Sequence, residues 1–310
     1  MELTQHRISS FGDLLDLWKQ GSKTGLQSIE FDLSVGHRSD ASTHLDIGHP
    51  LDLLQREKRN QTPIPAEEFF DQLSTVGINE IVIDIKARGF NKAKFQNDAG
   101  QPIADAEFFV GDQEKLYQEL PALLKTYQEQ ARERTGRESR IVIASVFPEF
   151  FLPEGEVAAH SAAFFQDLLK LGVATRFFAR TFDAKDSEKD VSKKRKIDPF
   201  AEANRLGVTQ IGIELPKQNL GEYLRWLKTL PQYEQYREFI SFYTVDDKTD
   251  LTEIQKEFPR AEVITNKSFA LEEISNNSTE QEKRREDDAV RQKEVAPFTV
   301  KNPEWKTRFN

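Results

Sequence analysis

The chain contains no cysteine. This absence excludes disulfide bonds, and it excludes metal sites built from thiolate ligands. It does not identify a cellular compartment, because many exported bacterial proteins also lack cysteine. Any metal site in this chain must therefore be built from oxygen or imidazole ligands.

The chain also lacks a long hydrophobic run and an excess of positive charge. No stretch of 18 apolar residues occurs, so we expect no transmembrane segment. The net charge is −9, and we expect no nucleic-acid partner, because nucleic-acid surfaces need clustered lysine and arginine. The opening residues, MELTQHRISS, are polar and do not resemble a signal peptide. They suit a cytoplasmic protein if Met1 is the native start, or the mature form of a secreted one.

The residues that are present suit one large α/β domain. Of the 310 residues, 37% are hydrophobic and 23 are phenylalanine, which is enough for an extensive core. A short strand is expected just before His6, and amphipathic helical patterns lie between the later strands. Seven further runs predict strands at 28–35, 80–85, 140–146, 175–179, 210–215, 239–245 and 261–265. Eight strands alternating with helices predict a TIM (β/α)8 barrel, and the chain has no glycine-rich nucleotide loop.

Three parts of the chain are expected from this pattern. Residues 1–274 form the predicted barrel, residues 275–294 form a charged linker or surface helix, and residues 295–310 form an apolar tail. Two irregular segments interrupt the barrel at 88–111 and 183–196. Four phenylalanines in segment 88–111 suit a surface loop docked on the barrel, and they would also suit contact with a lipid.

Two acids in the stretch SIEFDLS suggest a cation site. Glu30 and Asp32 lie two residues apart on a predicted strand, so their carboxylates point to the same side. Such close like charges repel each other unless a positive charge lies between them. Asp84, in IVIDIKA, supplies a third carboxylate on the next predicted strand of the barrel. A set of three hard oxygen ligands suits Mg²⁺, with Ca²⁺ as the alternative.

Further polar residues lie at the predicted strand ends, where barrel enzymes carry their active sites. His6 follows the first strand and His44 lies in the loop after the second, a pair that suits acid and base roles in phosphodiester chemistry. Lys86 would offset negative charge on a phosphate. Asp246 and Asn266 end the last two strands.

These stretches resemble the glycerophosphodiester phosphodiesterase superfamily. HRISSFGDLLDLWKQG followed by SIEFDLS looks like its opening, with a histidine after the first strand and Glu-x-Asp on the second. The likeness is closest to the sphingomyelinase D branch, the phospholipase D toxins of spiders and bacteria. IVIDIKA, SFYTVDD, EVITN and the tail FTVKNPEWKTRF are similar to successive motifs of that branch. The last of these implies that residues 295–310 plug the barrel.

The resemblance implies roles for individual residues. Glu30, Asp32 and Asp84 would hold one Mg²⁺, and His6 and His44 would be the two catalytic histidines. Substrate would be bound by Lys86, Tyr243, Asp246 and Asn266. The sequence departs from the branch in the loop around His44, which leaves His49 and His37 as alternatives. It also carries Tyr243 where the branch has tryptophan, which weakens a choline-binding aromatic cage.

We therefore expect a metal-dependent phosphodiesterase of the sphingomyelinase D type. It would release the head group of a sphingolipid or lysophospholipid and leave a cyclic phosphate. The lipid could be bound at a membrane surface. Two alternatives stay open: a glycerophosphodiester phosphodiesterase acting on soluble diesters, and a catalytically silent barrel that binds lipid head groups. The resemblance to toxins favours secretion, and a monomer is expected because no pairing surface is evident.

Overall fold

The structure is a computed structural model, and it describes residues 3–5, 28–37, 43–49, 53, 62–86, 113–153, 157–180, 197–216 and 219–265. His6 and Asn266 lie outside the described residues. So do the segments 88–111 and 183–196, the charged region 275–294 and the tail 295–310. The predicted barrel plug and the linker therefore stay predictions.

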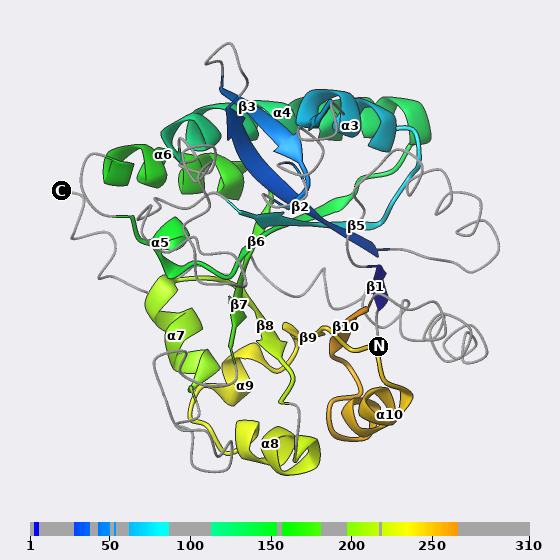
Figure 1. The fold of residues 1–310 in the computed structure, drawn as a ribbon, viewed down its shortest axis with the longest axis vertical. Helices are drawn as coiled ribbons and strands as arrows, with labels where there is room; N and C mark the ends of the chain where they lie inside the picture. Colours follow the sequence, from blue (N-terminus) through cyan, green and yellow to red (C-terminus); the bar gives the residue numbers. More distant parts are fainter. Residues whose placement is uncertain are drawn as a thin grey trace, which may run out of the picture.

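Eight parallel strands form a curled sheet whose ladder closes on itself (Figure 1). Each strand pairs in parallel with the next, and the first pairs with both the second and the last. The predicted mixed α/β class and all eight predicted strands are confirmed. These strands are β1 (Leu3–Gln5), β2 (Ser28–His37), β5 (Glu80–Ile85), β6 (Arg140–Ser145), β7 (Ala174–Ala179), β8 (Gln210–Glu214), β9 (Ile240–Tyr243) and β10 (Glu262–Thr265).

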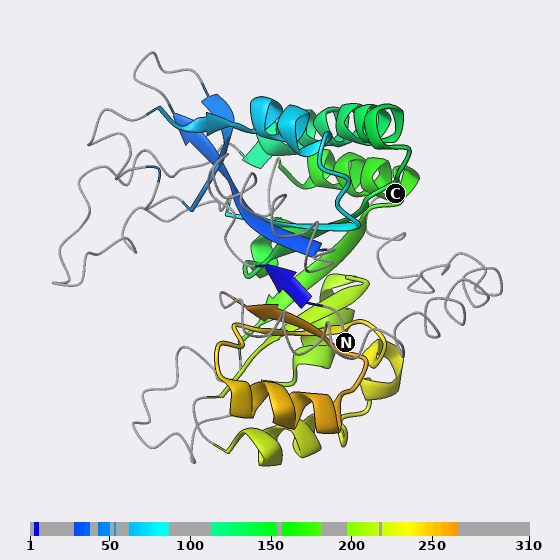
Figure 2. The ribbon, with the colours of Figure 1, turned by 90° about the vertical axis from the view of Figure 1, so that its right-hand side faces the viewer.

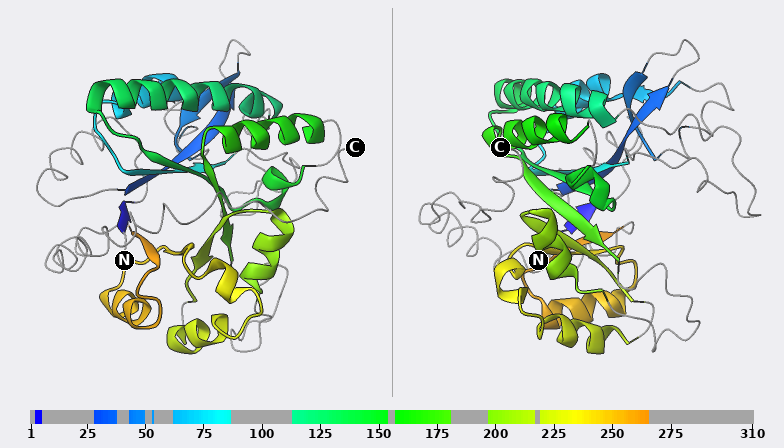
Figure 3. Two further views of the ribbon diagram at one scale, coloured as in Figure 1. Left: turned by 180° about the vertical axis from the view of Figure 1, so that it is seen from behind. Right: turned by 90° about the vertical axis from the view of Figure 1, so that its left-hand side faces the viewer.

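Helices cover the outside of this sheet (Figure 1). The longest pair, α4 and α6, lie side by side (Figure 3). No helix among the described residues is long and apolar enough to cross a membrane. The helices are α3 (Ala66–Leu73), α4 (Gln113–Thr135), α5 (Pro148–Phe151), α6 (Val157–Lys170), α7 (Pro199–Leu206), α8 (Leu220–Leu227), α9 (Tyr233–Tyr236) and α10 (Lys248–Glu257).

The alternating pattern of β2 decides which side chains enter the barrel. Ile29, Phe31 and Leu33 are fully buried on the outer face, in the core shared with the helices. The Phe31 ring meets Phe69 of α3 edge-on, with ring centroids 4.9 Å apart. Because successive strand residues face opposite sides, this packing directs the intervening residues Ser28, Glu30, Asp32 and Ser34 into the barrel.

A hairpin extends β2 beyond the barrel (Figure 2). Strand β3 (Thr43–Ile47) runs antiparallel to the second half of β2, and β4 (Ile64–Pro65) pairs with β3. The sequence did not predict either strand. His44 was predicted to lie in a loop, and that placement is wrong, because His44 lies on β3 opposite Gly36. The pairing of β3 involves residues about ten positions apart, so it depends on the register and not on a local pattern.

The inside of the barrel has an apolar middle layer. Its buried side chains are Val82, Val142, Ala144, Phe178 and Ile264. The Phe178 ring packs directly against Gly212, where an added Cβ would overlap the ring. Along β5 this layer separates Glu80 from Asp84, and along β7 and β10 it follows Arg176 and Glu262. The barrel therefore contains two polar clusters, one at each end.

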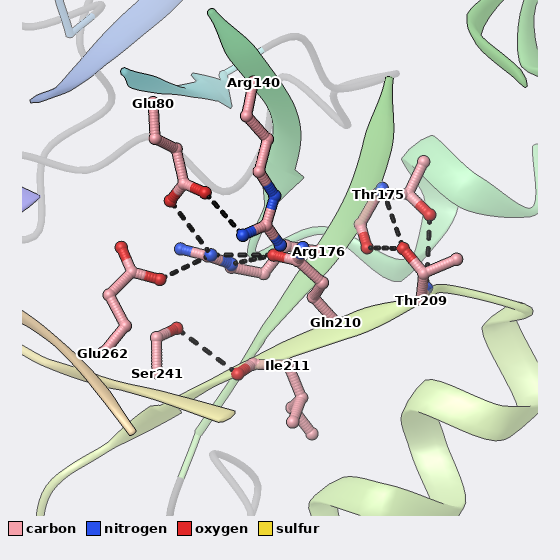
Figure 4. A network of polar contacts seen from close by, with 9 residues as sticks. All are labelled: Glu80, Arg140, Thr175, Arg176, Thr209, Gln210, Ile211, Ser241 and Glu262. Carbon is pink, nitrogen blue, oxygen red and sulfur yellow. Dashed lines mark hydrogen bonds and ion pairs between the residues drawn. The ribbon is translucent and has the colours of Figure 1, made fainter. Parts of the chain in front are cut away.

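The cluster at the N-terminal end of the strands is a network of ion pairs and hydrogen bonds (Figure 4). Arg176 donates to the side-chain oxygen of Gln210 at 2.7 and 3.1 Å and to Glu262 at 2.5 Å. Glu80 lies 3.8 Å from Arg176 and 2.9 Å from Arg140. We call Glu80, Arg140, Arg176, Gln210 and Glu262 the basal network. Residues at this end of a parallel barrel contribute to stability and lie away from the end used for chemistry.

Candidate functional site

Three buried carboxylates meet at the opposite end of the barrel. Glu30 and Asp32 come from β2 and Asp84 from the paired strand β5, where Asp32 and Asp84 lie directly opposite each other. One ligand oxygen from each residue lies within 4.8 Å of those of the other two. The three residues are 1%, 7% and 4% exposed. The structure thus brings together the predicted metal ligands, and we call them the carboxylate cluster.

Among the described residues, Lys86 brings a positive charge into contact with this cluster. Its ammonium lies 3.1 Å from Oδ1 of Asp32 and makes a short ion pair with Oδ2 of Asp84. Burial lowers the pKa of the Lys86 ammonium, but the charges of Asp84 and Asp32 outweigh burial and hold that pKa above its ordinary value. Lys86 therefore stays charged, and the four residues together carry two more negative charges than positive ones when all are ionised.

Asp84 has a raised pKa and a buried oxygen that accepts no hydrogen bond among the described residues. Burial, reinforced by the charges of Asp32 and Glu30, raises the pKa of Asp84 to about 7 although Lys86 acts in the opposite direction. Its Oδ1 atom is buried and has no hydrogen-bond partner among the described residues. A buried oxygen without a partner, beside two more carboxylates, fits a divalent cation with oxygen preference. The donor set thus suits Mg²⁺ or Ca²⁺.

The hairpin register places His44 and His49 at different distances from Asp32 along the hairpin. His44 pairs with Gly36, four residues beyond Asp32, which is about 13 Å along the strand at about 3.3 Å per residue. His49, in contrast, follows Gly48, whose backbone N–H donates to the carbonyl of Asp32 at 2.9 Å. Both histidines are half-buried. The backbone at Asp32 is therefore much closer to His49 than to His44 along the hairpin.

Besides Lys86, two predicted substrate-binding residues, Tyr243 and Asp246, are described. The Tyr243 hydroxyl donates to the carbonyl of Ala179 at 3.1 Å, and its ring meets Phe178 edge-on at 4.7 Å between centroids. Burial, followed by the charges of Glu214 and Asp84, holds the pKa of Tyr243 well above its usual range. Asp246 accepts a hydrogen bond from Thr265 at 3.2 Å. Tyr243 thus lies at the same end of the barrel as the carboxylate cluster, although its hydroxyl is held by the backbone.

Sequence reasoning missed two charged residues at this end of the barrel. Arg180 follows β7 and Glu214 ends β8, and both influence the pKa of Tyr243. Both are exposed, and they come two residues after the inward-facing Phe178 and Gly212. The alternation of strand residues would have identified them once the inward face was known. They lie across the barrel from β2, because β8 is four strands from β2 in the closed ladder.

Comparisons with known proteins add a fold assignment. No family model matches the chain, and no curated protein matches it. A protein of Silicibacter pomeroyi DSS-3 assigned as a glycerophosphoryl diester phosphodiesterase has a similar structure, with a TM-score of 0.53 and 10% sequence identity over 90% of this chain and 94% of that one. The chain shares the fold of this Silicibacter pomeroyi protein. A glycerophosphodiester phosphodiesterase of Parabacteroides distasonis ATCC 8503 matches at a TM-score of 0.48 and 12% identity, covering 90% of this chain and 98% of that one.

The predicted superfamily likeness is thus confirmed at the level of the fold. Neither structure named above is described as a sphingomyelinase D, so the choice of that branch stays a prediction. The same holds for the roles of His6 and Asn266, which lie outside the described residues. The arrangement that the structure establishes is a buried set of three acids and one lysine, at the end of the barrel where such folds carry their chemistry.

Proposed function

We propose that the protein is a metal-dependent phosphodiesterase. The observation that carries this proposal is the carboxylate cluster, in which Glu30, Asp32 and Asp84 place one oxygen each within 4.8 Å of the others. These residues would hold one Mg²⁺, with Ca²⁺ as the alternative, and the bound ion would supply Lewis-acid stabilisation to a phosphate oxygen. The fold of the Silicibacter pomeroyi protein supports the same reaction class, although its 10% identity limits that support to architecture.

Side chains of the protein would then stabilise the charge on the phosphate and transfer the protons. Lys86 would donate to a non-bridging phosphate oxygen and stabilise the additional charge that develops there. One histidine would accept the proton of the attacking hydroxyl, and the second would give a proton to the departing alcohol oxygen. In this scheme a bond forms between the attacking oxygen and phosphorus, and the bond from phosphorus to the leaving oxygen breaks. We assign the first of these roles to His6 by its place in the sequence.

For the second histidine we favour His49 over the originally predicted His44. His49 directly follows the residue that is hydrogen-bonded to Asp32, whereas His44 lies about 13 Å further along the hairpin at about 3.3 Å per residue. His44→Ala and His49→Ala should therefore differ. We expect His49→Ala to lower kcat by at least about 100-fold, the usual scale of general acid catalysis, and His44→Ala to change it much less. Equal losses, or the larger loss in His44→Ala, would restore the original assignment.

The finer proposal concerns the substrate. In the sphingomyelinase D reading, a hydroxyl of the lipid itself attacks phosphorus, and the head group leaves while a cyclic phosphate forms. The alternative is a glycerophosphodiester phosphodiesterase that uses water and acts on soluble diesters. The description of the Silicibacter pomeroyi protein favours this alternative at least as much. Tyr243 adds little support for choline, because its hydroxyl and ring are engaged by Ala179 and Phe178.

Phosphorus NMR separates these readings. Sphingomyelin, lysophosphatidylcholine and glycerophosphocholine are each incubated with the protein and Mg²⁺, and a parallel sample contains a chelator. A chelator-sensitive cyclic phosphate from either lipid would support the sphingomyelinase D reading. Turnover of glycerophosphocholine alone would support the soluble-diester reading. Mg²⁺ binding without turnover of any of the three substrates would favour the silent, head-group-binding barrel.

A further inference from the structure

Lys86 already contacts two of the three acids that would hold a cation. Its ammonium contacts one oxygen of Asp32 and one of Asp84, and both residues belong to the carboxylate cluster. The Lys86 side chain is 14% exposed, so little water screens these contacts. An ammonium and a divalent cation would compete for the same carboxylate lone pairs, and two positive charges a few ångströms apart repel strongly in such a place.

Lys86 is anchored through its backbone, whereas its contacts with the cluster are made by the end of a long side chain. The backbone N–H of Lys86 donates to the carbonyl of Leu33 at 2.8 Å, which anchors the residue just past the end of β5. Lys86 lies two residues beyond Asp84, so its side chain must reach back toward the middle of the barrel to contact that carboxylate. The lysine side chain is a flexible stem of four carbons, and other rotamers of this stem would point the ammonium away from the cluster.

We infer that Lys86 is an internal counter-ion that a divalent cation displaces from Asp32 and Asp84, and that the displaced ammonium then becomes available to the substrate phosphate. This inference rests on the proposed function, since it assumes that the carboxylate cluster binds a metal ion. It adds an order of events: the metal binds first and the phosphate second. Without the metal, the ammonium stays paired with Asp32 and Asp84 and is not available to a phosphate oxygen.

Metal titrations of the full chain test the displacement. Isothermal titration with Mg²⁺ is carried out on the wild type, on Lys86→Met and on Arg180→Met. Arg180 is the matched control, because it is exposed at the same end of the barrel and influences Tyr243, yet it follows β7 and not β5. We expect Lys86→Met to bind Mg²⁺ at least about tenfold more tightly, since no ammonium has to leave, and Arg180→Met to change the affinity less than about threefold. Equal changes of Mg²⁺ affinity in Lys86→Met and Arg180→Met would mean that any nearby positive charge weakens binding from a distance. That result would overturn the inference.

Phosphate binding supplies the second half of the test. Inorganic phosphate is titrated into the wild type and into Lys86→Met, each with and without saturating Mg²⁺. We expect Mg²⁺ to increase phosphate affinity in the wild type and to increase it much less in Lys86→Met. If Mg²⁺ increases phosphate affinity equally in Lys86→Met and in the wild type, the displaced ammonium does not bind the phosphate, and the inference is overturned.

A measurement on the wild type keeps the inference testable if Lys86→Met fails to fold. A buried ammonium in an ion pair exchanges its protons slowly, so nitrogen-15 NMR of lysine side chains should show a Lys86 signal without metal. Added Mg²⁺ should move this signal toward that of a solvent-exposed lysine. An unchanged signal in protein shown to bind Mg²⁺ would overturn the inference alone. Absence of Mg²⁺ binding by the wild type would overturn the proposed function as well.

Discussion

The two polar clusters inside the barrel are built from the same residue types but have opposite charge balance. The basal network sets Glu80 and Glu262 against Arg140 and Arg176, with Gln210 accepting two of the Arg176 hydrogen bonds. Among the described residues, the carboxylate cluster sets three acids against one ion-paired base, Lys86. A buried cluster whose charges cancel can serve the fold by itself, whereas a buried excess of negative charge needs another cation. The comparison therefore supports a structural role for the basal network and the proposed metal site at the other end of the barrel.

The largest expected effect comes from removing a charge at the C-terminal end. Asp84→Asn should abolish tight Mg²⁺ binding and lower turnover about 1,000-fold or more, because a metal ion supplies several kcal/mol of transition-state stabilisation. Isothermal titration and a phosphodiesterase assay measure the two losses. The matched control is Glu262→Gln in the basal network, which should leave Mg²⁺ affinity unchanged. A loss of Mg²⁺ binding in Glu262→Gln would show that the two clusters are not independent.

The next effect comes from breaking the basal network. Arg176→Met leaves Glu80 and Glu262 buried without their shared guanidinium, and it should lower the free energy of unfolding by about 3–5 kcal/mol. Arg140→Met is the control, because that side chain is 47% exposed and should cost less than about 1 kcal/mol. Urea unfolding measures both. The comparison between clusters fails if Arg176→Met is no more costly than Arg140→Met, or if it changes Mg²⁺ affinity in the folded protein.

The difference between the clusters also explains what could be read from the sequence. The eight parallel strands and the Glu30–Asp32 part of the carboxylate cluster were predictable, because β-branched runs and the spacing of two acids on one strand are local signals. The basal network was not predictable, since Glu80, Arg176 and Glu262 lie far apart in the chain and meet only through strand order. The placement of His44 failed for a related reason. A strand added by antiparallel pairing depends on the hairpin register, which the sequence leaves open.

A smaller effect should appear as a pH dependence of the metal-free protein. Asp84 keeps its proton up to about pH 7 in the folded chain, against an ordinary pKa of 3.8 in the unfolded one. Between these values the folded state binds more protons than the unfolded state, so the contribution of Asp84 to stability falls as pH rises from about 4 to about 7. The loss is up to roughly 4 kcal/mol, at 1.36 kcal/mol for each pKa unit.

Unfolding free energies of the wild type and Asp84→Asn isolate this contribution, since the remaining carboxylates are common to both proteins. Without metal, the difference between the two should change steadily over this pH range in favour of Asp84→Asn. With saturating Mg²⁺ the wild type should regain stability at pH 7 to 8, because the ion binds the ionised carboxylate. A difference that is constant with pH would mean that Asp84 is ionised in the folded protein throughout.

The smallest expected effect concerns Tyr243, which lies at the C-terminal end but makes structural contacts. Its hydroxyl is engaged with the carbonyl of Ala179, so Tyr243→Phe should lower the free energy of unfolding by roughly 1 kcal/mol and leave KM nearly unchanged. Tyr243→Ala also removes the ring that packs on Phe178 and should cost several times more. Steady-state kinetics and urea unfolding of both variants distinguish the two kinds of contribution. An increase in KM for Tyr243→Phe at unchanged stability would instead show that the hydroxyl leaves Ala179 to bind substrate, and it would extend the chemical end of the barrel from β2 and β5 to β9.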